Sequence, residues 1–327
     1  MSIVEPNAFA IIIAIENYRN SGSVGAINSV EYAHNDAVLF KDMLVNEFGL
    51  SNSNVIMLLD QNATKTALEN DLPYHIRNLS PGDRFYFYYA GHGFYKNGSN
   101  RLTVWDTNSF NLEGTTVCLN EILLKPLEAS QCSRSLIFID ACASDLVDIV
   151  ASRDLLSDMN KDEFEQFINS GGFQAVFTSC SPSEKSYPSN TLKHGIWTWH
   201  VINALKGSAP DAIVKEEFIT DSSLANYLKK AVPEYIRKNT TIRATQTPYA
   251  KISSSGTFEI RKLPALESPG NPDLPQLALD FDNYILRKQE FVGISRLPGF
   301  SKSKGHFVPD KFSEQTSRFI RERTFPR

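Results

Sequence analysis

A histidine and a cysteine in this sequence each follow an apolar run and are each flanked by small residues. His92 stands between Gly91 and Gly93 in YYAGHGF, and Cys142 stands in FIDACAS. A thiol becomes a strong nucleophile when an imidazole takes its proton, and that imidazole can later protonate a leaving amine. We interpret the two residues as a candidate nucleophile and base. The backbone N–H groups of Gly93 and Cys142 are candidates for stabilising the tetrahedral oxyanion.

Each of these residues also has an ordinary structural alternative. A lone buried cysteine is more often a small hydrophobic residue than a nucleophile. Cys118, Cys132 and Cys180 keep that structural interpretation, and their spacing indicates neither a zinc site nor a disulfide framework. What favours catalysis is the pairing of His92 with Cys142 at the ends of two apolar runs.

The elements that position this pair are short apolar runs separated by amphipathic stretches. We expect strands over 9–15, 54–60, 84–91, 134–140, 173–180 and 246–253. We expect helices over 28–49, 63–79, 195–207 and 222–238. This alternation predicts a three-layer α/β/α sandwich with a mostly parallel six-stranded sheet. If the third and fourth strands are neighbours, the histidine and the cysteine meet at one sheet edge, where such folds gather reactive groups.

Composition limits the partners and the setting. The chain has 327 residues, 42% of them hydrophobic and 21% charged, with a net charge of -4. We expect no nucleic-acid partner, because no global basic field is present. No apolar stretch approaches the roughly 20 residues needed to span a bilayer, so we expect no membrane partner and a reducing, cytoplasmic setting. A proline-rich and then basic texture after about residue 261 predicts one domain over 1–261 and a C-terminal extension over 262–327.

Several segments together match a known family. In order, they are AIIIAIENY, HNDAVLFKDML, NATKTALENDL, FYFYYAGHG, LIFIDACAS, AVFTSCSPSEKSY, HGIWTWHVINALKG and QTPYAKIS, covering roughly 8–255. The sequence resembles the caspase-like cysteine peptidases, the clan of caspases, metacaspases and paracaspases. This resemblance implies a Cys142–His92 endopeptidase that works through an acyl-enzyme and needs no metal or other cofactor. The region after the histidine motif holds Asp106 as its only aspartate, so the acidic calcium cluster of many metacaspases is not supported.

The resemblance also predicts the specificity pocket. Caspases that cut after aspartate carry glutamine two positions before the nucleophile, whereas this sequence carries Asp140, as do metacaspases and paracaspases, which cut after Arg or Lys. Asp36 and Glu184 match further pocket positions of those branches. A guanidinium entering a desolvated pocket needs carboxylates, and such acids reject an acidic side chain. The structural alternatives are a strand-end cap for Asp140, a polar helix face for Asp36 and a solvated loop charge for Glu184.

Control of such an activity has candidate elements too. The segment 144–172 is long, and with basic specificity Arg153 and Lys161 are candidate self-cleavage sites. The extension is a candidate regulatory segment or a segment that packs around the core. We expect a protein or peptide substrate with a basic residue before the scissile bond, and a small-molecule or protein activator. Family analogy suggests an effector in microbial defence or cell death. The alternatives are a catalytically silent scaffold or sensor, disfavoured by the intact pair, and an aspartate-directed caspase, disfavoured by the acids.

Overall fold

The computed structural model describes most of the chain up to residue 264 and two short strands beyond it. The described residues are 8–19, 26–132, 134–142, 158–170, 172–182, 184–253, 256–264, 300–303 and 306–309, with the backbone alone described for Cys142, 300–303 and 306–309. The chain divides into two compact units, Met1–Ala265 and Leu266–Arg327. The predicted division between 261 and 262 therefore falls just inside the first unit.

The first unit is built on one large sheet. Its strands are β1 (Ala8–Ala14), β2 (Val55–Leu59), β3 (Arg84–Lys96), β4 (Ser99–Leu102), β5 (Val117–Cys118), β6 (Arg134–Cys142), β7 (Phe173–Thr178) and β12 (Tyr249–Ile252). The main path runs β12-β7-β6-β3-β1-β2, and β4 and β5 extend from the end of β3. Along this path only β12 pairs antiparallel. The six predicted strands and the mostly parallel sheet are confirmed.

The central strands are apolar on both faces because both faces are covered. In β3, Phe85, Phe87 and Tyr89 belong to one hydrophobic cluster, whereas Tyr86 and Tyr88 belong to the other. Successive side chains of a strand point to opposite faces, so a continuous apolar run serves two cores at once. This is why β3 and β6 lie in the middle of the sheet.

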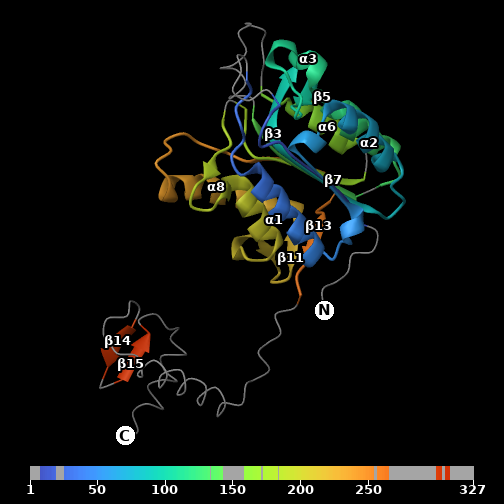
Figure 1. Ribbon diagram of the computed structural model, residues 1–327. Helices are drawn as coiled ribbons and strands as arrows, with labels where there is room; N and C mark the ends of the chain where they lie inside the picture. The colour runs from blue at the N-terminus through green and yellow to red at the C-terminus, as the bar shows by residue number, and fades with distance from the viewer. Residues whose placement is uncertain are drawn as a thin grey trace. The chain divides into compact units, whose positions relative to one another are not determined.

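Helices cover both faces and complete the predicted three layers. They are α1 (Ala33–Asn46), α2 (Lys65–Arg77), α3 (Leu112–Thr115), α4 (Lys125–Ala129), α6 (Lys161–Asn169), α7 (Ile196–Leu205) and α8 (Asp221–Asn239), with a π-helical turn at Asn120–Leu124. Buried residues of α1, α7 and α8 join one core cluster, and those of α2, α4 and α6 join the other. Figure 1 shows α1 and α8 on one side of the sheet and α2 and α6 on the other.

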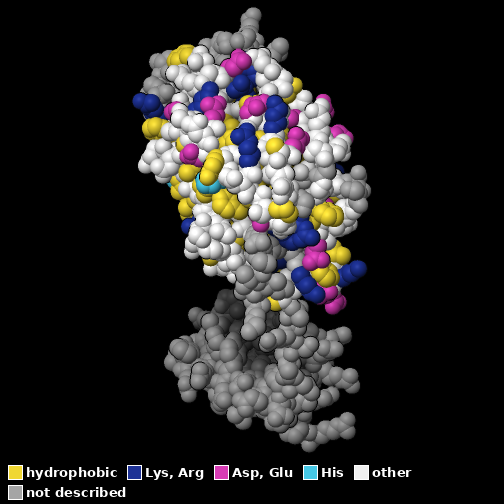
Figure 2. Space-filling view, turned by 90° about the vertical axis from the view of Figure 1, so that its right-hand side faces the viewer, with side chains coloured by type: hydrophobic (Ala, Val, Ile, Leu, Met, Phe, Trp, Pro, Cys, Tyr) yellow, Lys and Arg dark blue, Asp and Glu magenta, His cyan; other side chains and the backbone are white. Residues whose placement is uncertain are grey.

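Smaller pairings complete the described structure. They are a sheet of β10 (Ile213–Val214), β11 (Phe218–Thr220) and β13 (Glu259–Lys262), the pair β8 (Pro188–Ser189) and β9 (His194–Gly195), and, in the second unit, the pair β14 (Phe300–Ser303) and β15 (His306–Pro309). None of the described helices has the length and apolar character needed to cross a bilayer. On the face shown in Figure 2, basic and acidic side chains of the first unit are interspersed rather than gathered by sign.

Candidate active site

The predicted pair lies on two adjacent strands. β3 and β6 run parallel, and their register places His92 opposite Cys142 and Gly91 opposite Ala141. Cys142 is the last residue of β6, whereas β3 continues past His92 and turns into a hairpin in which Gly93 pairs with Leu102 of β4. The fold therefore brings the two backbones side by side at the carboxyl edge of the sheet, where ligands gather in such folds.

His92 is buried and held from two sides. His92 is only 3% exposed, and Nε2 of its ring lies 2.9 Å from the Asn28 carbonyl oxygen. Because a carbonyl oxygen can only accept, Nε2 carries the proton in the neutral ring and Nδ1 is the basic nitrogen. The Tyr18 ring stacks on the imidazole, with centroids 5.7 Å apart and planes 19° apart. This tautomer suits a group that must accept a thiol proton at Nδ1.

Gly93 packs closely against the segment beside β6. A Cβ at this position would lie 3.0 Å from Ala141 Cβ and 3.1 Å from Met159 Sδ. Such contacts are tighter than most Cβ contacts, so a larger residue here requires Ala141 or Met159 to shift by a few tenths of an ångström. The oxyanion role predicted for the Gly93 and Cys142 N–H groups stays a prediction.

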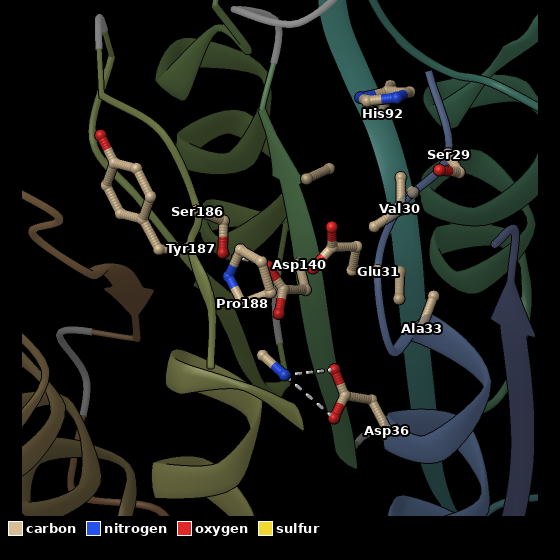
Figure 3. Close-up of a pocket in the computed structure, with 14 residues that line it drawn as sticks. Ser29, Val30, Glu31, Ala33, Asp36, His92, Asp140, Ser186, Tyr187 and Pro188 are labelled. Atoms are coloured by element: carbon tan, nitrogen blue, oxygen red, sulfur yellow. Dashed lines mark hydrogen bonds between the residues drawn. The ribbon is translucent and has the colours of Figure 1, made fainter. Parts of the chain in front are cut away.

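A cavity of about 180 Å³ opens beside His92. It lies below the roughly 300–1,000 Å³ of sites for drug-sized ligands, which favours a single side chain as its occupant. Figure 3 shows Asp36 and Asp140 facing into it from α1 and β6, with Glu31 reaching in from the loop before α1. The lining residues are Ser29, Val30, Glu31, Ala33, Asp36, Ala90, Gly91, His92, Asp140, Ala141, Ser186, Tyr187, Pro188 and Gly195.

Asp140 is a buried carboxylate bound by hydroxyl groups. It is 8% exposed, and it accepts hydrogen bonds from Ser186 Oγ at 2.6 Å and Thr198 Oγ1 at 2.8 Å. Burial raises the pKa of this carboxyl group, and the two hydroxyl donors offset only part of that effect. Neutral donors satisfy the oxygens but supply no positive charge, so the carboxylate is left without a full counter-charge by these partners.

Asp36 faces the same cavity from the first turn of α1. Its carboxylate lies 2.8 Å from His194 Nδ1 and accepts the Gly195 N–H at 3.0 Å, a bond marked by a dashed line in Figure 3. Burial raises the pKa of Asp36 to about 7; the bond to His194 opposes the rise, and the charge of Asp140 adds to it. The pocket therefore holds an acid that is close to half-protonated at neutral pH.

The two carboxylates converge on one point. A Cβ at Gly195 would lie 2.9 Å from Asp36 Oδ2 and 3.0 Å from Asp140 Oδ2. Beneath them, burial and then the charges of these two acids hold the pKa of Tyr88 well above its usual value. Two buried carboxylates that disfavour each other's charge are stabilised by a cation placed between them.

The other predicted site residues lie elsewhere. Glu184 does not line this cavity; its carboxylate accepts bonds from the Thr247 N–H and hydroxyl and from the Thr245 hydroxyl. Lys161 is the first residue of α6, and its ammonium lies 3.9 Å from the centre of the Tyr249 ring. Arg153 lies outside the described residues.

Several residues that bind the pocket acids carried no strong signal in the sequence. Ser186 and His194 come from the region between β7 and α7, Thr198 comes from α7, and all three reach the acids only through folding. Glu31 could have been noticed, because it stands five positions before Asp36 in the same segment. Serine and threonine are common in loops and helices, so nothing in their local pattern marked them.

Among the described residues, no group of three or more His, Cys, Asp or Glu side chains is arranged to hold a metal ion. Asp106, the aspartate after the histidine motif, accepts the Lys65 N–H at 2.9 Å and so caps α2. Its role in the structure is thus that of a helix cap.

A mostly parallel α/β/α sandwich with a His and a Cys paired at its carboxyl edge defines the caspase-like class of proteins. A model of the caspase domain of peptidase family C14 matches residues 7–255, so the chain belongs to that family. Membership confirms the resemblance and supports a peptidase-type activity on protein substrates. Among solved structures, the chain is similar to a protein of Geobacter sulfurreducens, with 16% identity, a TM-score of 0.49, and coverage of 76% of this chain and 94% of that one. No curated protein gives a significant match.

Proposed function

We propose that this protein is a cysteine endopeptidase that cuts after Arg or Lys, with Cys142 as nucleophile and His92 as base. The observation that carries the proposal is the small cavity beside His92 that buries the carboxyl groups of Asp36 and Asp140. A pocket of this kind next to a candidate dyad can hold the side chain before the scissile bond.

The proposed chemistry needs only groups of the chain and water. His92 Nδ1 takes the Cys142 thiol proton as sulfur attacks the substrate carbonyl carbon, and the oxyanion forms beside the Gly93 and Cys142 N–H groups. As the C–N bond breaks, the imidazolium gives its proton to the leaving amine, and a thioester remains. His92 then deprotonates a water molecule that attacks the thioester, which releases the carboxylic acid and returns the thiol.

Basic selectivity follows from the charges of the pocket. A guanidinium between Asp36 and Asp140 would supply the positive charge that their hydroxyl and N–H partners do not, and its planar fork of donors suits two carboxylates. An aspartate side chain there would add a third buried negative charge. The substrate-binding role of Glu184 stays a prediction. Its carboxylate oxygens accept hydrogen bonds from Thr245 and Thr247.

Self-cleavage is a further part of the proposal. The bond after Lys161 lies in the first turn of α6, where Asn160 caps the helix through the Asp162 N–H. A peptidase binds its substrate extended, so cleavage there requires this helix to unwind first. Mass spectrometry of the incubated protein would detect cleavage after Arg153 or after Lys161.

The test uses peptides that differ only in the residue before a fluorogenic leaving group. We expect turnover of the Arg and Lys peptides, none of the Asp peptide, and loss of all turnover in Cys142→Ala but not in the control Cys118→Ala. Asp140→Asn, which keeps the shape of the side chain, should lower kcat/KM for the Arg peptide while alkylation of Cys142 by iodoacetamide continues. Turnover of the Asp peptide alone would refute the basic pocket, and no turnover of any peptide would leave the scaffold alternative.

A further inference from the structure

Two groups that hold His92 come from one loop. This loop leaves β1 at Ala14 and reaches α1 at Ala33. Its first arm carries Tyr18, which stacks on the imidazole, and its second arm carries Asn28, whose carbonyl oxygen lies 2.9 Å from Nε2. The orientation of the candidate base therefore depends on where this loop is held.

The base of the loop is bound by a carboxylate from the neighbouring strand. Asp60, directly after β2, accepts the Glu16 N–H at 2.8 Å and the Asn17 N–H at 3.1 Å on the same oxygen, and the Asn17 side-chain amide at 3.3 Å on the other. The Val30 N–H in turn donates to the Glu16 carbonyl at 3.0 Å. Both arms of the loop are thus tied, directly or through Glu16, to one carboxylate.

A histidine joins α1 to the same carboxylate. His34 Nε2 lies 2.9 Å from Asp60 Oδ1, and the His34 N–H donates to the Glu16 carboxylate at 3.0 Å. Burial of Asp60 opposes its ionisation, but the Asn17 N–H and the His34 ring outweigh burial and lower the pKa of the carboxyl group. The group is therefore ionised at neutral pH and acts as an acceptor only.

The backbone of Asp60 adopts an unfavourable conformation, and the hydrogen bonds of its carboxylate offset the energetic cost. Its φ is 39°, in the left-handed region that L-residues seldom adopt, although aspartate tolerates it better than most. Such conformations persist where the surrounding structure over-determines them, and they cluster at functional sites.

We propose that Asp60 is a positioning residue for His92, acting through the loop that carries Tyr18 and Asn28. This inference rests on the proposed function only in that His92 is the base. Asp60 itself touches neither the substrate pocket nor the reacting atoms, but Ser29, Val30 and Glu31 of the same loop line the pocket. Its loss should therefore lower kcat chiefly and raise KM to a smaller extent. A displacement of about 1 Å at a catalytic group can cost about a hundredfold in rate.

The experiment compares Asp60→Ala and Asp60→Asn with the control Asp71→Asn, an exposed aspartate in α2. We measure kcat per active site, titrated with an alkylating Arg peptide, and KM for the Arg peptide. Asp60→Ala should lower kcat by about a hundredfold, with a smaller rise in KM. Asp60→Asn keeps an oxygen for the two backbone N–H groups and should fall between Asp60→Ala and the control. A kcat for Asp60→Ala equal to that of the control, or a rise in KM without a fall in kcat, would overturn the proposal.

A second readout does not depend on turnover. In protein labelled with ¹⁵N-histidine, the His92 ring signals, assigned by their loss in His92→Gln, report which ring nitrogen holds the proton. We expect the Nε2–H tautomer in the wild type and in Asp71→Asn, and a mixture of tautomers in Asp60→Asn and Asp60→Ala. Retention of a single tautomer in both Asp60 variants would refute the positioning role. Because this signal exists even if no peptide is cleaved, failure of the proposed function is distinguishable from failure of this inference.

Discussion

The narrowest point of the pocket is the space at Gly195, and filling it is the sharpest test of the specificity model. Gly195→Ala places a methyl group 2.9 Å from Asp36 Oδ2 and 3.0 Å from Asp140 Oδ2. The backbone itself tolerates alanine, because Gly195 has φ -60° and ψ 132°, an extended conformation open to any residue. The substitution therefore acts through the two carboxylates and not through backbone strain.

The size of the effect follows from the overlap. Contacts of this length force a carboxylate to move by a few tenths of an ångström, and overpacking of this kind costs about 1–3 kcal/mol. In the empty pocket Asp36 can turn aside, whereas a bound guanidinium needs both carboxylates facing it. We therefore expect most of the cost in binding, which corresponds to a fall in kcat/KM for the Arg peptide of about 5- to 150-fold.

The assay measures turnover of the Arg peptide and, separately, alkylation of Cys142 by iodoacetamide, which does not occupy the pocket. Gly195→Ala should lower kcat/KM through KM, while the rate of Cys142 alkylation by iodoacetamide and the melting temperature change little. Gly256→Ala is the matched control, since a Cβ there meets nothing within 4 Å. If Gly195→Ala cleaves the Arg peptide as well as Gly256→Ala does, the P1 side chain does not enter between Asp36 and Asp140.

Four further predictions concern the acids of the pocket and Glu184. Because burial raises the pKa of Asp36 from its usual 3.8 to about 7 in the folded protein, the group's contribution to the free energy of unfolding should fall as pH rises from 4 to 7, by at most about 1.4 kcal/mol per pH unit. Denaturant titrations of wild type and Asp36→Asn at pH 5 and 8 measure this. By the same linkage, KM for the Arg peptide should fall as pH rises through 7, and a pH-independent KM would contradict it. Thr198→Val removes a donor to Asp140 at 2.8 Å and should weaken Arg-peptide binding by about tenfold, seen as a higher KM. Glu184→Ala removes the acceptor of the Thr247 hydroxyl and should lower the free energy of unfolding, measured with denaturant, by about 1 kcal/mol or more. A fall in turnover of the Arg peptide that exceeds the fall for the Lys peptide would instead support the predicted pocket role of Glu184.

The main elements of the fold were predictable because they depend on local periodicity. Apolar runs long enough for two buried faces marked the six strands of the main path, and three- and four-residue spacing marked α1, α2, α7 and α8. The small pairings were not foreseen, for example β4 with β5 and β10 with β11. Strands of two to four residues are too short for a period to be visible, and their partners are set by where the longer elements place them.

The residues of the site were also predictable only in part. Cys142 and His92 each follow an apolar run, so a rule about the carboxyl edge of parallel sheets was enough to single them out. The pocket role of Asp140 was predicted from the family resemblance. The donors that hold them, among them Thr198, come from distant segments of the chain. Their pairing has no local signature, because it depends on the packing of α7 against α1 and β6.

By itself, the sequence determined which reactive residue types the protein carries and at which edge of the sheet they gather, since strand periodicity and chain order decide both. Only the tertiary structure decided how those residues are charged and aimed. The raised pKa of Asp36 arises from burial and a neighbouring acid, and the Nε2–H tautomer of His92 arises from a carbonyl 64 positions away. Burial and hydrogen-bond partners are properties of packed segments, so no local pattern in the chain could have specified them.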